Sequence, residues 1–149
     1  MIAELATWGD YVVDPAVDFN EKLDRWDAFA AQQEQIAAPL KHRFMHGLYM
    51  REILMPAGSI ITSRVHRYES PFFIAAGKVI VVSENEGNVI YSAPHAGITQ
   101  PGTRRILLML EDTTWITVHP NPDDHTDVAA LVDELTYINP NAHMLEVES

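Results

Sequence analysis

Hydrophobic residues recur with a helical period near both ends of this chain and with the period of short strands between them. The N-terminal pattern predicts an amphipathic helix that begins after Asp18 and ends near Gln35, with Asp18 as N-cap and Glu21 completing a capping box. We expect this helix to cover the outside of the protein's own β-sheet, and packing across a dimer interface is the alternative. Its apolar positions are Phe19, Leu23, Trp26, Phe29 and Ala30.

The middle of the chain contains short apolar runs separated by turn residues, which predict about seven β-strands. We expect breaks at 56–58, 84–87, 94–97 and 100–102, where proline, glycine and polar turn residues are concentrated. Regularly spaced short strands are typical of a sandwich or barrel, and a jelly roll is one arrangement that protects exposed strand edges. The predicted strands cover residues 48–55, 60–66, 72–76, 78–83, 88–92, 104–110 and 114–119.

The helical period returns after residue 122. Thr126 or Asp127 is placed to cap this second helix. We expect an N-terminal arm and helix at 1–39, a barrel at 40–122, and a C-terminal helix and tail at 123–149. A length of 149 residues is compatible with one globular domain that buries a core. The apolar face of the second helix comprises Val128, Leu131, Val132 and Leu135.

Composition excludes several kinds of site. The chain has no cysteine, which rules out disulfides, thiolate metal ligands and a cysteine nucleophile. Ten basic and 21 acidic residues give a formal charge of −11, so we expect no nucleic-acid partner, because phosphate backbones are bound by clustered Lys and Arg. The longest apolar runs are too short to span a membrane, and the N-terminus lacks a signal-peptide pattern. We therefore expect a cytoplasmic protein without a membrane partner.

The segment from Gly58 to Gly77 resembles the first motif of the cupin family. In that motif a glycine precedes a strand ending in His-x-His, a glutamate follows a few residues later, and a second glycine closes the segment. Here His66 and Glu69 match the second histidine and the glutamate, whereas Arg64 stands in place of the first histidine. The resemblance therefore implies a cupin with a degenerate metal motif.

Further blocks extend the resemblance over residues 44–120. The turn at 100–102 is similar to the start of the second cupin motif, and Arg105 lies where that motif has a histidine. The resemblance implies a mainly β fold, the cupin double-stranded β-helix or jelly roll, with an N-terminal and a C-terminal flanking helix. Because cupins commonly pair, it also implies a homodimer. The blocks at 42–44, 47–52, 55–58, 101–105 and 110–120 are similar to small, mostly uncharacterised cupins of tailed bacteriophages and prophages.

The basic residues at the motif positions predict a pocket for a small anion inside the barrel. Strand alternation would turn Arg64 and His66 toward the same interior face, and arginine binds a carboxylate or phosphate through two parallel hydrogen bonds. The structural alternative is that Arg64 pairs with Glu69 or Glu52 and only fills the barrel. The candidate ligand-binding residues are Arg64, His66, Glu69, Tyr91 and Arg105.

Two other functions remain open at this stage. A metal-dependent cupin enzyme of the dioxygenase or isomerase type would bind a divalent metal through His66, Glu69 and either His119 or His95. A virion or assembly protein, located in the host cytoplasm or in the particle, would use the barrel as a scaffold. The sequence is compatible with a protein that has no cofactor and with one that holds a divalent metal.

Overall fold

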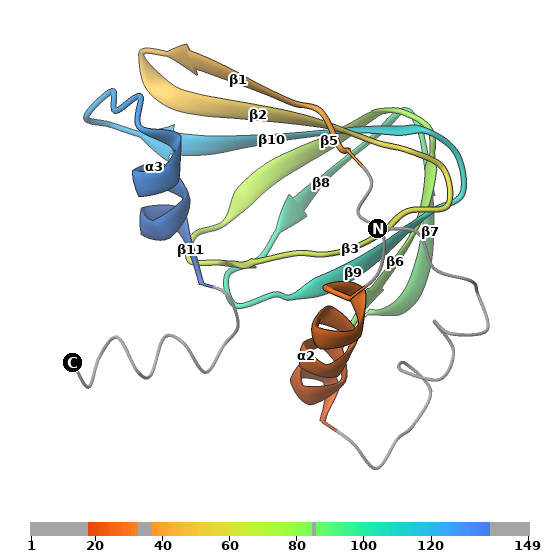
Figure 1. Cartoon of the computed structure of the whole chain (residues 1–149). Helices are drawn as coiled ribbons and strands as arrows, with labels where there is room; N and C mark the ends of the chain where they lie inside the picture. The colour runs from red at the N-terminus through yellow and green to blue at the C-terminus, as the bar shows by residue number, and fades with distance from the viewer. Residues whose placement is uncertain (1–17, 33–36, 85, 138–149) are drawn as a thin grey trace.

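The computed structural model describes residues 18–32, 37–84 and 86–137, so the predicted N-terminal arm and C-terminal tail lie outside the described residues. Two antiparallel sheets face each other and form a barrel (Figure 1). The five-stranded sheet has the order β1-β2-β10-β5-β8 and the four-stranded sheet the order β3-β9-β6-β7. Strands distant in sequence thus lie side by side, as the predicted jelly roll requires.

The strands are short and are joined mostly by tight turns. The two strands β4 and β11 form a separate small sheet. The bounds are β1 (Leu40–Met45), β2 (Gly47–Met55), β3 (Ile60–Thr62), β4 (Val65–His66), β5 (Ser70–Ala76), β6 (Lys78–Ser83), β7 (Gly87–Ser92), β8 (His95–Thr99), β9 (Arg105–Met109), β10 (Thr113–Asn121) and β11 (Thr136–Tyr137).

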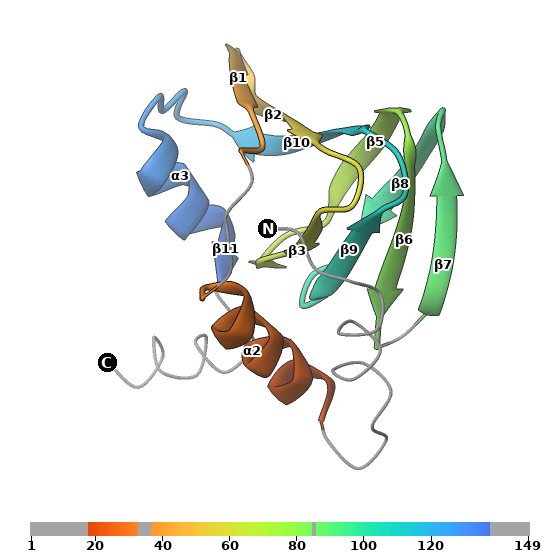
Figure 2. The same cartoon turned by 45° about the vertical axis from the view of Figure 1, so that its right-hand side comes forward.

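The N-terminal helix α2 (Phe19–Ala30) begins as predicted and ends before Gln35. The carboxylate of Asp18 accepts hydrogen bonds from the backbone N–H groups of the first helical turn. Trp26 is only 1% exposed and packs in one core cluster with residues of β3, β6 and β9. The helix therefore covers its own sheet, which confirms the first of the two expectations (Figures 1 and 2).

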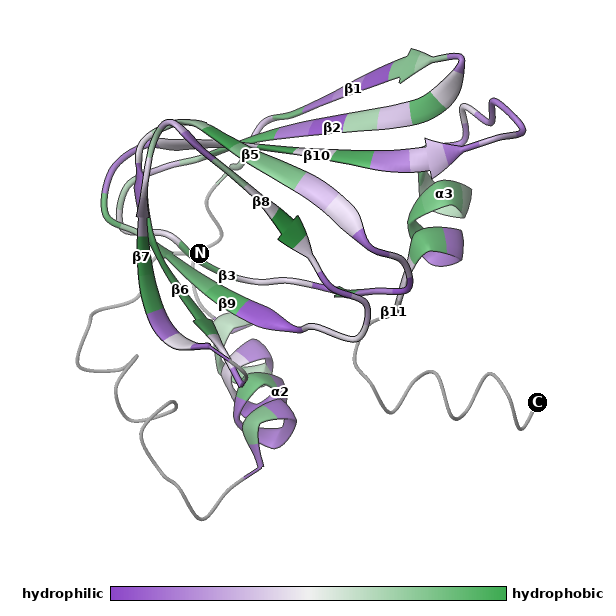
Figure 3. Cartoon of the chain, turned by 180° about the vertical axis from the view of Figure 1, so that it is seen from behind, coloured by the Kyte–Doolittle hydropathy of each residue, from purple (hydrophilic) through white to green (hydrophobic). Residues whose placement is uncertain are grey.

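Strand β9 separates two hydrophobic cores. Its outward residues Ile106 and Leu108 pack under α2, whereas Leu107 and Met109 pack inside the barrel. A strand that is covered on both faces typically has apolar residues at consecutive positions. All five residues of β9 are buried. Figure 3 shows β9 as hydrophobic except at its beginning, where Arg105 starts the strand.

The predicted strand 60–66 is divided into β3 and β4, with Ser63 and Arg64 between them. Ser63 stays bound to β9, because its backbone N–H donates to Arg105 O at 2.7 Å and its hydroxyl accepts from Arg105 N at 2.9 Å. The break changes which residues face inward. Ile60 packs toward α2, whereas Arg64 and His66 line the barrel cavity. Arg64 and His66 thus share an interior face, as predicted, but the alternation does not extend back to Ile60, which faces α2.

Besides the two-residue strand β11, two strands were not predicted. Residues 40–45 form β1, a hairpin partner of β2. The expected break at 94–97 belongs largely to β8, which pairs with β5. Gly97 is needed there because it has no side chain: a Cβ atom at this position would lie 2.6 Å from the Phe72 ring. Close packing in the sheet outweighs the turn propensity of the local sequence.

The C-terminal helix α3 (Val128–Leu135) lies at one end of the barrel (Figure 1). Of the two candidate caps, Asp127 is the one used, and its carboxylate accepts from Ala130 N at 3.2 Å. Leu131 and Leu135 pack on Tyr49 of β2, and β11 then pairs with β4. Neither described helix has the length and apolar character needed to cross a bilayer.

Candidate functional site

A cavity of about 180 Å³ lies inside the barrel, between the inner faces of the two sheets and the end of α3. Its wall combines arginine, histidine, small hydroxyl and large apolar side chains, and no acidic side chain contributes among the described residues. The polar lining residues are Tyr49, Arg51, Thr62, Ser63, Arg64, His66, Arg105, Thr117, His119 and Thr136.

Arg105 lies at the inner wall of this cavity, as the sequence predicted from its motif position, and is only 9% exposed. Its Nη2 donates to Thr99 Oγ1 at 2.6 Å. Its guanidinium carbon lies 5.1 Å from the ring centroid of Phe72 and 5.5 Å from that of Trp115. No described carboxylate forms an ion pair with it. Burial lowers the pKa of Arg105, and electrostatic interactions with Tyr91 and Glu86 raise it, so the buried positive charge is only partly balanced.

Arg51 is a second inward cation, which the sequence analysis missed. It lies in β2 on the same face as the buried residues Tyr49 and Met55. Its Nε is buried and has no hydrogen-bond partner among the described residues. Alternation along the predicted strand 48–55 was the available signal, because every second residue from Tyr49 faces the barrel.

Arg64 lies at the open side of the cavity, with its side chain 37% exposed. Its Nε donates to Thr136 Oγ1 at 2.6 Å, and its Nη2 lies 3.7 Å from Asp133 Oδ1. The predicted alternative pairing with Glu69 or Glu52 is therefore wrong. Glu52 instead pairs with two basic side chains of β1. Arg64 links the cavity to the C-terminal helix.

His66 and His119 lie side by side in the cavity wall, with their ring centroids 5.5 Å apart. His66 Nδ1 is 3.1 Å from Ser70 Oγ, and His119 Nε2 is 3.0 Å from Thr117 Oγ1. The structure thus brings together two of the predicted metal ligands and adds His119 to the predicted anion pocket.

Both imidazoles are neutral at physiological pH. Burial lowers the pKa of His66 to about 3, with further lowering by the charges of His119, Arg105 and Arg51. Burial, followed by the charge of Arg51, lowers the pKa of His119 to about 4. A low-dielectric site that already holds two guanidinium groups disfavours a third positive charge.

This shift predicts acid sensitivity. Between about pH 6.5 and pH 4 the unfolded chain protonates His119 while the folded protein does not, so the free energy of unfolding should fall as the pH is lowered. For this one group the loss amounts to at most about 3 kcal/mol. His119→Gln should reduce the loss, and His125→Gln, at an exposed position, should not. Urea unfolding of the three proteins between pH 4 and 7 measures the effect, and identical slopes would contradict it.

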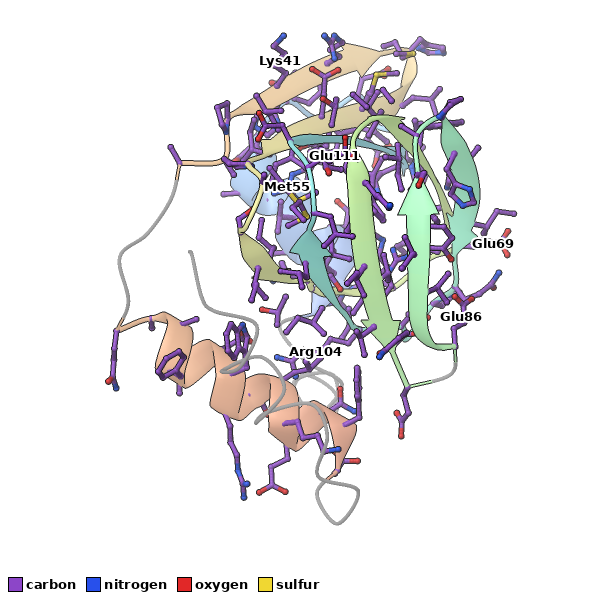
Figure 4. The ribbon with its side chains drawn as sticks, turned by 90° about the vertical axis from the view of Figure 1, so that its right-hand side faces the viewer. Lys41, Met55, Glu69, Glu86, Arg104 and Glu111 are labelled. Atoms are coloured by element: carbon purple, nitrogen blue, oxygen red, sulfur yellow. The ribbon has the colours of Figure 1, made fainter. Side chains whose placement is uncertain are left out.

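The other predicted site residues lie elsewhere. Glu69 is exposed on the outside of the barrel (Figure 4). Tyr91 stacks on His95 with 4.3 Å between ring centroids, and its hydroxyl donates to Glu86 at 3.3 Å. Both of these rings contact Phe72, and neither belongs to the cavity wall. The chain bends between β4 and β5, which directs Glu69 away from the histidines.

Solved structures show what kind of fold this is. KdgF from Halomonas sp. is 17% identical, with a TM-score of 0.50 over 64% of this chain and 86% of that one. An uncharacterised conserved protein with a double-stranded β-helix domain from Klebsiella pneumoniae is 13% identical, with a TM-score of 0.51 over 63% and 85%. An RmlC-like cupin family protein from Methanocaldococcus jannaschii is 9% identical, with a TM-score of 0.49 over 62% and 88%.

The chain thus has the cupin double-stranded β-helix fold, as the sequence motifs predicted, with one flanking helix N-terminal and one C-terminal to the barrel. No protein-family model matches the sequence, and no curated protein matches it. At these identities the likeness establishes the fold alone, because one fold supports many activities. Function must be argued from the cavity.

Cupins often hold a divalent metal, but the residues of this cavity do not fit one. His66 and His119 converge, whereas Glu69 does not join them. Within the described residues no group of three His, Asp or Glu side chains is placed to hold a metal ion. The nearby guanidinium groups are cationic and cannot act as ligands. The predicted site of His66, Glu69 and His119 is therefore not assembled.

Proposed function

We propose that the barrel binds a small organic anion, a carboxylate or phosphate, with Arg51 and Arg105 as its main contacts. The observation that carries the proposal is that no carboxylate contacts the two guanidinium groups in the cavity wall, of which Arg105 is buried and Arg51 half-buried. Both guanidinium groups line the cavity, and the described residues supply no acidic group to its wall. An unpaired buried charge is strongly unfavourable, and a bound anion would offset that penalty.

The size of the cavity limits the ligand. About 180 Å³ is smaller than the roughly 300–1,000 Å³ of sites for drug-sized molecules. Met55, Leu107 and Trp115 form an apolar wall that a short carbon skeleton would cover. A ligand of a few carbon atoms with one or two acid groups matches both the volume and this wall. Arg64, at the open side, is placed to contact the same ligand as it enters.

Calorimetric titration with acetate, propionate, succinate and inorganic phosphate tests this proposal. We expect Arg105→Met and Arg51→Met each to weaken binding about 10- to 100-fold, because each removes a charge-assisted hydrogen bond in a low-dielectric site. Arg43→Met is the matched control, since Arg43 pairs with Glu52 outside the cavity. The proposal is wrong if no anion binds, or if all three variants bind alike.

We also propose a relationship to bacteriophage cupins and a homodimer. The relationship to bacteriophage cupins is supported by the sequence blocks described above, and a location in the host cytoplasm or the virion depends on it. The homodimer is supported by exposed apolar side chains on the strands of the five-stranded sheet. These are Leu40, Phe44, Met45, Leu48, Leu54, Phe73 and Ile98.

A further inference from the structure

The two cavity histidines each have an unused nitrogen. His66 is held through Nδ1 by Ser70, and His119 through Nε2 by Thr117. The opposite nitrogen of each ring, His66 Nε2 and His119 Nδ1, has no hydrogen-bond partner among the described residues. Both side chains belong to the cavity wall. The two neighbouring rings, tilted by 40° to each other, thus offer two polar atoms that hydrogen-bond to no described residue.

A neutral imidazole has one donor and one acceptor nitrogen, and the hydrogen bond made by the held nitrogen decides which is which. Ser70 and Thr117 hold the rings through hydroxyl groups, which both donate and accept. Either ring can therefore present a donor or an acceptor to the cavity. A ligand hydroxyl complements such a pair, because it donates one hydrogen bond while accepting another. A carboxylate only accepts, and it is bound better by guanidinium groups.

The cationic and neutral parts of the wall are adjacent. Arg51 in β2 pairs in register with Thr117 in β10, and the Thr117 side chain contacts His119. On the other side, Arg105 is close enough to His66 for its charge to act on that ring. A ligand whose acid group contacts the arginines would therefore have its next one or two carbon atoms beside the imidazoles.

We infer that the cavity selects a short hydroxycarboxylate, with the acid group on Arg51 and Arg105 and the hydroxyl group on His66 and His119. The inference rests on the proposed anion site and makes the histidine pair its specificity determinant. A polar site built for a hydroxyl discriminates against the analogue that lacks it, since its donors and acceptors are then left unpaired.

Matched acids test this selection. Calorimetric titration compares lactate, as both enantiomers, with propionate, and malate with succinate. We expect the better lactate enantiomer and malate to bind at least about tenfold more tightly than the analogue without the hydroxyl. In His66→Leu and His119→Leu the ratio of the two affinities should approach one. His66→Gln and His119→Gln, which keep a polar side-chain end, should retain part of the preference.

The outcomes separate the two proposals. If hydroxy and deoxy acids bind equally to the unmodified protein, and His66→Leu leaves their ratio unchanged, the hydroxyl selection is overturned while the anion site stands. If no acid of either pair binds but acetate or inorganic phosphate does, only the hydroxyl selection is overturned, and if none of these anions binds, both proposals are overturned. Arg105→Met should weaken both members of each pair, and circular dichroism of each variant establishes that the fold is retained.

Discussion

Replacing Arg104 with alanine is expected to lower the free energy of unfolding by about 3 kcal/mol and to loosen α2 from the barrel. The Arg104 side chain is 2% exposed and lies between α2 and the four-stranded sheet (Figure 4). Its Nη1 donates to Asp24 Oδ1 at 2.8 Å and to Asn20 O at 3.1 Å, and its Nη2 donates to Asp27 Oδ2 at 2.9 Å. The two carboxylates are partly hydrated, which keeps the loss at the lower end for a buried ion pair.

Arg25→Ala is the matched control for Arg104→Ala. Arg25 forms an ion pair with Glu21 within the same helix, but its side chain is 58% exposed. Its removal should change the free energy of unfolding by no more than about 0.5 kcal/mol. Urea denaturation gives the stabilities, and hydrogen exchange of the α2 amides reports whether the helix has loosened. Equal unfolding midpoints for the two variants would show that Arg104 does not hold α2 in place.

Gly77→Ala should destabilise the barrel by about 3 kcal/mol or more. Gly77 connects β5 of one sheet with β6 of the other and has a φ of +99°, a conformation that L side chains rarely adopt. A Cβ atom there would lie 2.6 Å from Thr113 Cα and would also collide with the carbonyl oxygen of Asp112. These are backbone atoms, so relief requires the strands themselves to move.

Gly87→Ala separates the two causes of this effect. Gly87 also has a positive φ, +67°, but a Cβ atom there would meet no atom within 4 Å. Only the conformational cost of about 1–2 kcal/mol should remain. Thermal unfolding of both variants measures the difference. If Gly87→Ala is as damaging as Gly77→Ala, the close approach of Asp112 and Thr113 contributes nothing.

Local sequence patterns predicted most helices and strands, because these elements depend mainly on residues close together in the sequence. The caps Asp18 and Asp127 and the strand 78–83 follow from the side-chain chemistry and periodicity of short segments. The predicted secondary structure was wrong where contacts with a segment distant in sequence determine the conformation. The segment 94–97 contains a proline and a glycine, but pairing with β5 and the close approach of Phe72 make its residues from His95 onward part of a strand.

In the candidate site, too, some residues were predictable from the local sequence and others depended on distant contacts. Motif position alone placed Arg105 and His66 in the barrel, because the cupin framework fixes which strand positions face inward. It also suggested Glu69 and Tyr91, which the bend after β4 and the packing around Phe72 keep outside the cavity. Arg51 was accessible through strand alternation, although its lack of a partner became visible only when the strands were assembled.

The sequence by itself determined the helices at both ends, most of the strands and the cationic replacement of the usual metal ligands. These are properties of residue type and short-range spacing. Only the tertiary structure decided which of the cavity's positive charges have no carboxylate in contact. Arg64 contacts Asp133 and Thr136, about 70 residues later in the chain, whereas Arg105 and Arg51 contact no carboxylate of the described residues. Charge balance in a cavity depends on which distant side chains converge there, and no local pattern records that.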